Sequence, residues 1–295
     1  MIIFRKENKT IFDTKTGILC RGIEKKPSAP ELIDLKVTNK CEANCDFCYM
    51  SSHKNGKHAD LDWITQQLYS LPTRPLQIAV GGGEPTLWPD LLTFVYMCRA
   101  LGIVVNTAVG PNPNLNMLRK ITRPNHMSAV GISYVNEKRF EKVLNVAKEG
   151  DSTLFAHCIL RSDKMQEWID KANKWPKEIA GIIFLLFKPC GKAKDKTELI
   201  PTQEQFEKLI EAYKKSGKEI GFDSCTSELL KGHVEEECID ACDGGQYSLF
   251  VDGANQTCGP CSFLPTEFDL SKISLNEAWQ KIERIKNCKF ALRRT

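Results

Sequence analysis

The feature that most constrains the fold is a regular alternation of short apolar, β-branched segments with longer segments of helical periodicity. The apolar segments are the predicted strands 32–37, 76–80, 103–109, 128–134, 153–160 and 181–187. The segments between them have apolar residues at helical spacing, and several begin at a capping residue. Repeated βα units require a parallel sheet whose right-handed crossovers bring the C-terminal strand ends to one face. The sequence therefore predicts an α/β fold with its functional residues at that face.

Three parts are predicted along the chain of 295 residues, which is long enough for a large α/β unit with an appendage. Residues 1–30 contain short predicted strands and a Pro-containing linker. Residues 31–217 contain the βα alternation. Residues 218–295 lose the alternation after one further short apolar segment and are rich in cysteine, so we place the main boundary at residue 218.

Composition and charge exclude several classes of protein. Apolar residues make up 42% of the chain and charged residues 26%, which is typical of a folded soluble protein, and no apolar run has the length of a membrane span. The N-terminus is charged within its first five residues and has no secretory signal pattern, which predicts a cytoplasmic protein. A scattered net charge of +4 does not indicate nucleic-acid binding.

The cysteine content indicates metal binding or catalysis. Thirteen cysteines is a high number for a cytoplasmic chain, in which disulfides are rare. Some of them lie among apolar residues and are predicted to be small core side chains. These are Cys20, Cys98, Cys158 and Cys288.

Cys41, Cys45 and Cys48 form a C-x3-C-x2-C loop directly after the first predicted strand of the alternation. Soft thiolates select zinc, copper(I) or iron–sulfur clusters. A structural zinc site needs four protein ligands, so this loop would require a distant fourth. A [4Fe-4S] cluster held by three cysteines instead leaves one iron open to an outside ligand.

This loop, with Phe47 just before its last cysteine, resembles that of the radical S-adenosylmethionine (SAM) superfamily. The resemblance implies a partial (βα)6 barrel and a [4Fe-4S] cluster on Cys41, Cys45 and Cys48, whose open iron binds SAM. It also implies an electron donor such as flavodoxin or ferredoxin. Reductive cleavage of SAM then gives a 5'-deoxyadenosyl radical, which abstracts a hydrogen atom from the substrate.

A second motif, Gly-Gly-Glu-Pro-Thr at 82–86, ends the second strand and resembles the GGEPT motif of that superfamily. Glycines permit close backbone approach, and a carboxylate suits the ammonium group of SAM. The implied SAM contacts in this motif are Gly82, Gly83, Glu84 and Pro85. Further candidate contacts at the following strands are Asn106, Thr107 and Ser133.

No catalytic acid, base or hydrogen donor is assigned from the sequence. Tyr134, Lys188 and Asp223 lie where they could face the cavity, but packing or surface roles are favoured for each. His157 lies in an apolar strand and is predicted to be a barrel-interior histidine.

The C-terminal part has a C-x10-G-x4-C pattern formed by Cys242, Gly253 and Cys258. It resembles the cysteine-rich SPASM extension or its shorter twitch form, which holds an auxiliary [4Fe-4S] cluster. A single cysteine after Cys261 favours the one-cluster form. The predicted ligands are Cys225, Cys242, Cys258 and Cys261, with Cys238 as a competitor. A zinc knuckle is the alternative.

The resemblance covers about residues 31–270 and implies a radical SAM enzyme that modifies a peptide or protein. The first 23 residues are too short for a leader-recognition domain, so a small molecule or nucleotide is the alternative substrate, as in the molybdenum-cofactor cyclase. An interpretation of a different class is a non-catalytic iron–sulfur or zinc binding module. Fold-level analogy does not fix the substrate.

Overall fold

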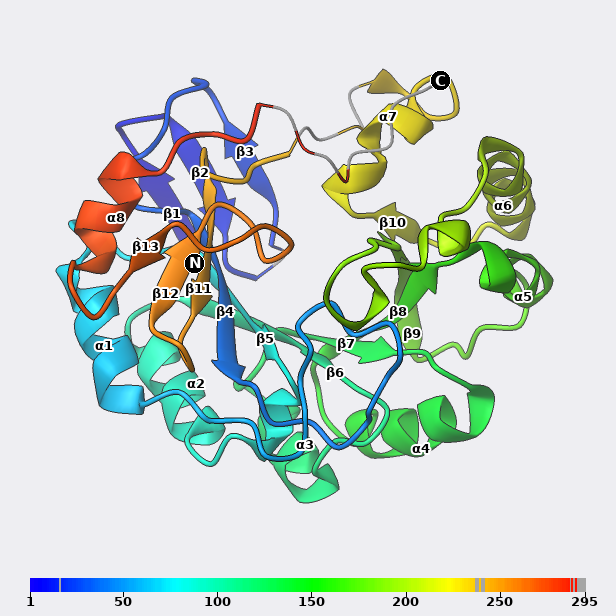
Figure 1. Ribbon diagram of the computed structural model, residues 1–295, viewed down its shortest axis with the longest axis horizontal. Helices are drawn as coiled ribbons and strands as arrows, with labels where there is room; N and C mark the ends of the chain where they lie inside the picture. The colour runs from blue at the N-terminus through cyan, green and yellow to red at the C-terminus, as the bar shows by residue number, and fades with distance from the viewer. Residues whose placement is uncertain (16, 237–238, 240–241, 287, 289, 291–295) are drawn as a thin grey trace.

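A computed structural model describes the chain except for residues 16, 237–238, 240–241, 287, 289 and 291–295. Within the described residues, a ten-stranded sheet of order β10-β9-β8-β7-β6-β5-β4-β11-β12-β13 forms the centre (Figure 1). Each neighbouring pair of strands from β10 to β11 in this order is parallel, as βα units require. The barrel strands are β4 (Leu32–Thr38), β5 (Gln77–Gly82), β6 (Val104–Val109), β7 (Ala129–Ser133), β8 (Thr153–Leu160), β9 (Ile179–Leu186) and β10 (Ile220–Phe222). All six strands predicted from the alternation are confirmed.

Helices connect these strands and cover the outer side of the curved sheet (Figure 1). They are α1 (Leu61–Ser70), α2 (Leu91–Ala100), α3 (Leu115–Ile121), α4 (Glu137–Ala147), α5 (Met165–Lys171) and α6 (Gln203–Ser216). Side-chain caps fix several of their starts, because the first backbone N–H groups of a helix need acceptors. The predicted capping box of Thr202 and Gln205 is present, and α6 ends at Gly217 with φ of 66°.

The N-terminal residues form a separate antiparallel sheet, as the sequence predicted. It contains β1 (Ile2–Arg5), β2 (Thr10–Asp13) and β3 (Leu19–Arg21). The buried carboxylate of Glu31 connects this sheet to the start of β4, because it accepts hydrogen bonds from Asn8, Thr10 and Arg21 at 2.7–2.8 Å.

The C-terminal part continues the sheet of the barrel beyond its first strand. β11 (Ser248–Asp252) returns to pair in parallel with β4, and β12 (Thr257–Gly259) and β13 (Phe268–Asp269) follow in antiparallel order. Two short helices complete this part, α7 (Ser227–Leu230) and α8 (Leu275–Lys281). The cysteine-rich segment is therefore held against the barrel beside the strand that leads into the three-cysteine loop.

Candidate functional site

The three-cysteine loop follows the C-terminal end of β4, where the sequence predicted it. The Cys41 N–H donates to the His53 carbonyl at 3.0 Å, which closes the loop, and the Lys192 N–H donates to the Cys48 carbonyl at 3.0 Å. Burial raises the pKa of Cys41 and Cys45, and the neighbouring thiolate of Cys48 raises both further. The three thiols therefore lie close enough to repel one another when ionised, and a cationic metal centre would remove this repulsion.

Phe47 is half-buried within the same loop. The Arg161 guanidinium lies 5.2 Å from the centroid of its ring, and Arg161 also faces Asp46 with 3.8 Å between charged atoms. A cation over an aromatic ring and a nearby carboxylate both hold the loop against the end of β8.

Gly82 and Gly83 bring the end of β5 into close contact with the residues that enter this loop. A Cβ atom on Gly82, whose φ is +123°, would lie 2.4 Å from the Thr38 carbonyl oxygen. A Cβ on Gly83 would lie 2.2 Å from the Lys40 carbonyl oxygen, and the Gly83 N–H donates to Thr38 at 2.7 Å. Only glycine fits this approach. Sequence reasoning expected close approach to a ligand and missed this contact with the chain itself.

Glu84 is almost fully buried and connects two backbone segments. One carboxylate oxygen accepts from the Thr86 N–H and hydroxyl at 3.1 and 2.6 Å, and the other accepts from the Gly110 N–H at 2.7 Å. Burial raises the pKa of Glu84, while these hydrogen bonds oppose the shift. The side chain thus joins the end of β5 to the end of β6, and Pro85 begins the buried turn between β5 and α2.

The other predicted SAM contacts divide between the two faces of the sheet. Asn106 is half-buried, and it lies on the same face of β6 as Ala108, which lines the cavity described below. Thr107 is 5% exposed on the opposite face, and its hydroxyl donates to the Val80 carbonyl at 2.9 Å. Ser133 is half-buried at the end of β7, in register with His157 of β8.

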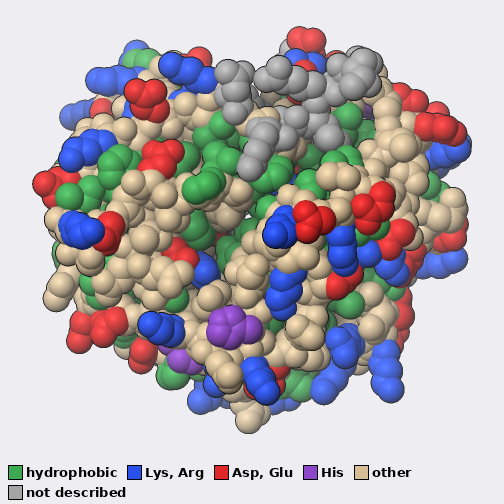
Figure 2. All heavy atoms as spheres, viewed as in Figure 1, with side chains coloured by type: hydrophobic (Ala, Val, Ile, Leu, Met, Phe, Trp, Pro, Cys, Tyr) green, Lys and Arg blue, Asp and Glu red, His purple; other side chains and the backbone are tan. Residues whose placement is uncertain are grey.

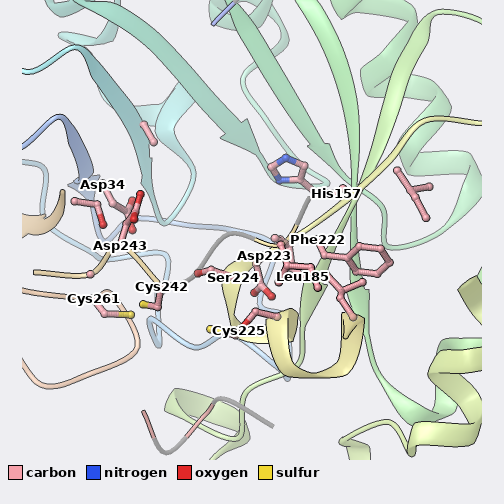
Figure 3. Close-up of a pocket in the computed structure, with 18 of the residues that line it drawn as sticks. Asp34, His157, Leu185, Phe222, Asp223, Ser224, Cys225, Cys242, Asp243 and Cys261 are labelled. Atoms are coloured by element: carbon pink, nitrogen blue, oxygen red, sulfur yellow. The ribbon is translucent and has the colours of Figure 1, made fainter. Parts of the chain in front are cut away.

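A cavity of about 1020 Å³ opens between the barrel strands and the C-terminal cysteine-rich part. Figure 2 shows hydrophobic side chains gathered around a hollow on this face, and Figure 3 shows the polar side chains inside it. Tyr49, next to the last cysteine of the loop, forms part of the wall. Leu185, Phe222 and Phe250 supply apolar surface. The arrangement is that of a large ligand site with few polar groups.

Asp34 of β4 is a half-buried acid in the wall of this cavity. Burial raises its pKa to about 6, although a hydrogen bond from Ser262 lowers it. The same Ser262 hydrogen bonds with Tyr49, whose pKa burial raises. A carboxylate has about four acceptor positions, so Asp34 retains acceptor capacity toward the cavity.

Lys188 and Asp223 form an ion pair at the edge of the cavity, with 2.5 Å between Nζ and Oδ2. Lys188 is almost fully buried, and its ammonium lies 4.2 Å from the centroid of the Phe263 ring. Burial raises the pKa of Asp223, although Lys188 opposes the shift. Tyr134 instead packs among aromatic rings that include Trp168, in agreement with the packing role that the sequence favoured.

His157 is a barrel-interior histidine, as the sequence predicted, and it lines the cavity (Figure 3). A Cβ on Gly131 of the neighbouring strand would lie 2.3 Å from its ring, so glycine makes room for it. Burial lowers the pKa of His157 to about 4, and the imidazole is therefore neutral at pH 7.

Three of the four predicted auxiliary ligands line the cavity. Figure 3 shows Cys225, Cys242 and Cys261 pointing into the same part of it. Cys258 is fully buried in β12, and Cys238 lies outside the described residues. Among the described residues, no three His, Cys, Asp or Glu side chains are close enough to hold a single metal ion. Two groups of three thiols, one in the loop and one here, offer the soft donors that iron–sulfur clusters use.

None of the helices in the described ranges combines the length and the apolar character needed to span a membrane.

Comparisons with known proteins give partial sequence matches and an extended structural match. No family profile matches the chain. A segment of 101 residues is 31% identical to 7,8-dihydro-6-hydroxymethylpterin dimethyltransferase of Methanocaldococcus jannaschii, covering 30% of this chain and 19% of that protein. Another of 83 residues is 30% identical to PqqA peptide cyclase of Gluconobacter oxydans, covering 27% and 23%. Each match thus spans less than a quarter of the relative.

Two solved structures have the same fold. Streptococcus suis SuiB bound to precursor peptide SuiA has a TM-score of 0.64 at 15% identity, covering 86% of this chain and 65% of that chain. A histidine-tagged form of anSMEcpe with bound AdoMet also has a TM-score of 0.64 at 15% identity, covering 85% and 78%. These two matches show the fold of the chain, a partial barrel of parallel strands with helices on its outer side.

Proposed function

We propose that the protein is an enzyme that cleaves SAM reductively and takes a hydrogen atom from a peptide or protein. The observation that carries this proposal is the junction of the two motifs: the glycines that end β5 pack against the entry to the three-cysteine loop, and the adjoining cavity measures about 1020 Å³. The names of the relatives support two candidate substrate classes, a peptide and a small molecule.

In this proposal Cys41, Cys45 and Cys48 hold a [4Fe-4S] cluster, and the fourth iron position is left to SAM. The cluster and SAM, when bound, supply the electron and the radical. The chain supplies position: the paired ends of β4 and β5 fix the loop that contains Phe47, while Asn106 lies on the face of β6 that lines the cavity. Because the side chain of Glu84 already accepts three hydrogen bonds, the backbone of the motif is the better candidate for contact with the SAM ammonium group.

A peptide or protein substrate is supported by the cavity and by the relatives. Apolar walls with a half-buried acid, Asp34, and an ion pair at the edge suit a substrate side chain that enters from solvent. SuiB is bound to a precursor peptide in its structure, and PqqA peptide cyclase is named for a peptide. The match to a pterin dimethyltransferase favours a small molecule as the second candidate.

The cysteines on the opposite wall suit an auxiliary [4Fe-4S] cluster of the SPASM or twitch kind. Cys225, Cys242 and Cys261 line the cavity that the substrate would enter. A cluster there would lie next to the substrate and could take an electron from it. A cytoplasmic flavodoxin or ferredoxin would supply electrons to the catalytic cluster.

The formation of 5'-deoxyadenosine tests the proposed activity. The protein is purified without oxygen, reconstituted with iron and sulfide, and mixed with SAM and a strong reductant. We expect product from the wild type and none from the Cys41→Ala/Cys45→Ala/Cys48→Ala variant. Cys20→Ala, at an exposed position, is the matched control and should behave as the wild type. An iron-loaded wild type that forms no 5'-deoxyadenosine, with or without a peptide extract, would contradict the proposal.

The substrate class is tested by stimulation of the same reaction. Cell extract is added to the assay before and after digestion with a protease. A peptide or protein substrate predicts stimulation that the protease removes. Stimulation that survives the digestion would instead favour the small-molecule candidate.

A further inference from the structure

The pairing of β11 with its two neighbours determines which face of the sheet Cys258 occupies. Phe250 is in register with Asp34 of β4, and both line the cavity. The next residue, Val251, is in register with Leu35 of β4 and with Cys258 of β12. Successive side chains of a strand point to opposite faces, and paired residues point to the same face. Cys258 therefore points away from the cavity, toward the side that the helices cover.

The surroundings of Cys258 agree with this assignment. It is 0% exposed and belongs to the hydrophobic core with Leu270, Leu275 and Trp279. The charged group within electrostatic range of its thiol is Glu267, and no other described thiol acts on it. A slip of β12 by one residue would be needed to turn the thiol to the cavity, and it would turn every other side chain of the strand as well.

The C-terminal segment brings a different cysteine to the cavity cysteines. The Ile285 N–H donates to the Gly244 carbonyl at 3.0 Å, and the Phe290 ring packs 6.4 Å from the Phe263 ring between centroids. Gly244 lies two residues after Cys242, and Phe263 lies two residues after Cys261. Both of these cysteines line the cavity. Cys288, which is half-buried, lies between the two contacts.

Electrostatic contacts link Cys288 to the same group of thiols. Cys288 lies within electrostatic range of both Cys225 and Cys261. Cys242 lies within the same range of Cys261. The Phe263 N–H donates to the Cys261 sulfur at 3.4 Å, and hydrogen bonds of this kind are common at cluster ligands.

We propose that Cys288 is the fourth thiolate of the auxiliary site, with Cys225, Cys242 and Cys261, and that Cys258 is a core side chain. This inference rests on the proposed function, in which the C-terminal part holds an iron–sulfur cluster. It replaces two predictions from the sequence, namely that Cys258 is one of the four ligands and that Cys288 is a core side chain. The cluster would then connect the segment that contains Cys288 to the edge of the barrel.

Iron content in a background without the catalytic cluster tests the assignment. The Cys41→Ala/Cys45→Ala/Cys48→Ala protein is reconstituted anaerobically, and iron, acid-labile sulfide and the EPR signal of the reduced cluster are measured. About four irons per chain are expected in this background. Adding Cys288→Ala should remove the four-iron content and the signal. Adding Cys258→Ala, the matched control, should preserve both.

The other outcomes separate failure of the assignment from failure of the proposed function. A cluster that survives Cys288→Ala and is lost with Cys258→Ala or Cys238→Ala would overturn the assignment and leave the auxiliary cluster in place. If the Cys41→Ala/Cys45→Ala/Cys48→Ala protein takes up no iron, it holds no auxiliary cluster. Both the proposed cluster and the assignment of Cys288 to it would then be wrong.

A measurement on the full wild-type chain covers the case in which a variant fails to fold. Thiols are alkylated before and after reconstitution and identified by mass spectrometry. Cys288 should react in the metal-free protein and be protected once the cluster is present. Cys20 is exposed and should react in both states, whereas Cys258 should react in neither. Equal labelling of Cys288 in both states would contradict the proposal.

Discussion

Replacement of Gly83 by alanine tests whether the GGEPT motif positions the cysteine loop by direct contact. The added Cβ would lie 2.2 Å from the Lys40 carbonyl oxygen and 2.7 Å from its carbon, both backbone atoms that cannot rotate away. The end of β5 must therefore separate from the loop entry. This weakens the hydrogen bonds that the Gly83 and Glu84 N–H groups donate to Thr38 and Lys40 at 2.7 and 2.8 Å.

The expected loss in the free energy of unfolding is about 3 kcal/mol. Overpacking of a filled site costs about 2 kcal/mol, and weakening of the two hydrogen bonds adds about 1 kcal/mol. With a urea slope of about 3 kcal/mol per molar, this corresponds to a midpoint lower by about 1 M. Urea unfolding of the reconstituted protein, followed without oxygen by tryptophan fluorescence, measures the shift.

Gly81→Ala is the matched control, because Gly81 lies two residues before Gly83, within β5, and its added Cβ would meet only Asp34 Oδ1, at 3.8 Å. Its midpoint should stay within about 0.2 M of the wild type. The Gly83 variant should also lose iron from the adjacent Cys41 loop, and the Gly81 variant should not. Equal midpoints and equal iron contents in the two variants would refute the reasoning.

Three further predictions concern the cavity. The pKa of Asp34 is raised to about 6, so folding favours the protonated carboxyl group. The protonated group contributes to the stability of the folded protein at low pH, and this contribution is lost as the pH rises through about 6. Asp34→Asn should therefore raise the stability at pH 7 by up to about 3 kcal/mol, with little difference from the wild type below pH 4, in urea titrations at both pH values. Gly131→Ala should lower the stability by about 2 kcal/mol, because the added Cβ meets the His157 ring, and His157→Ala in the same chain should restore part of the loss in a double-mutant cycle. Lys188→Met should cost about 3 kcal/mol by leaving Asp223 without its cation, and adding Asp223→Asn should recover most of this in thermal unfolding.

The barrel and the two motifs were predictable because their signals are local. β8, for example, alternates between buried and half-buried residues along most of Thr153–Leu160. The matching alternation of residue types can be recognised in the sequence. The cysteine loop follows a strand, and strand order with right-handed crossovers brings it to the same edge as Gly82. No long-range contact has to be known for either inference.

The details of the site depend on long-range pairing that no local pattern contains. The return of β11 to β4 joins residues more than 200 positions apart, and this pairing determines the face of Cys258. The spacing of Cys258 from Gly253 carries no information on that face. Similarly, the apolar Ile285 and Phe290 on either side of Cys288 suggest a core thiol, whereas in the fold these two residues contact Gly244 and Phe263 beside the cavity.

The central claim, that three cysteines leave an iron open for SAM, is tested most directly by EPR. In the Cys225→Ala/Cys242→Ala/Cys261→Ala protein only the cluster on the Cys41 loop should remain, and its reduced form is recorded before and after SAM is added. The account predicts that SAM changes this signal, and that SAM leaves unchanged the signal of the complementary variant without Cys41, Cys45 and Cys48. A signal from the loop cluster that SAM does not alter would contradict the account.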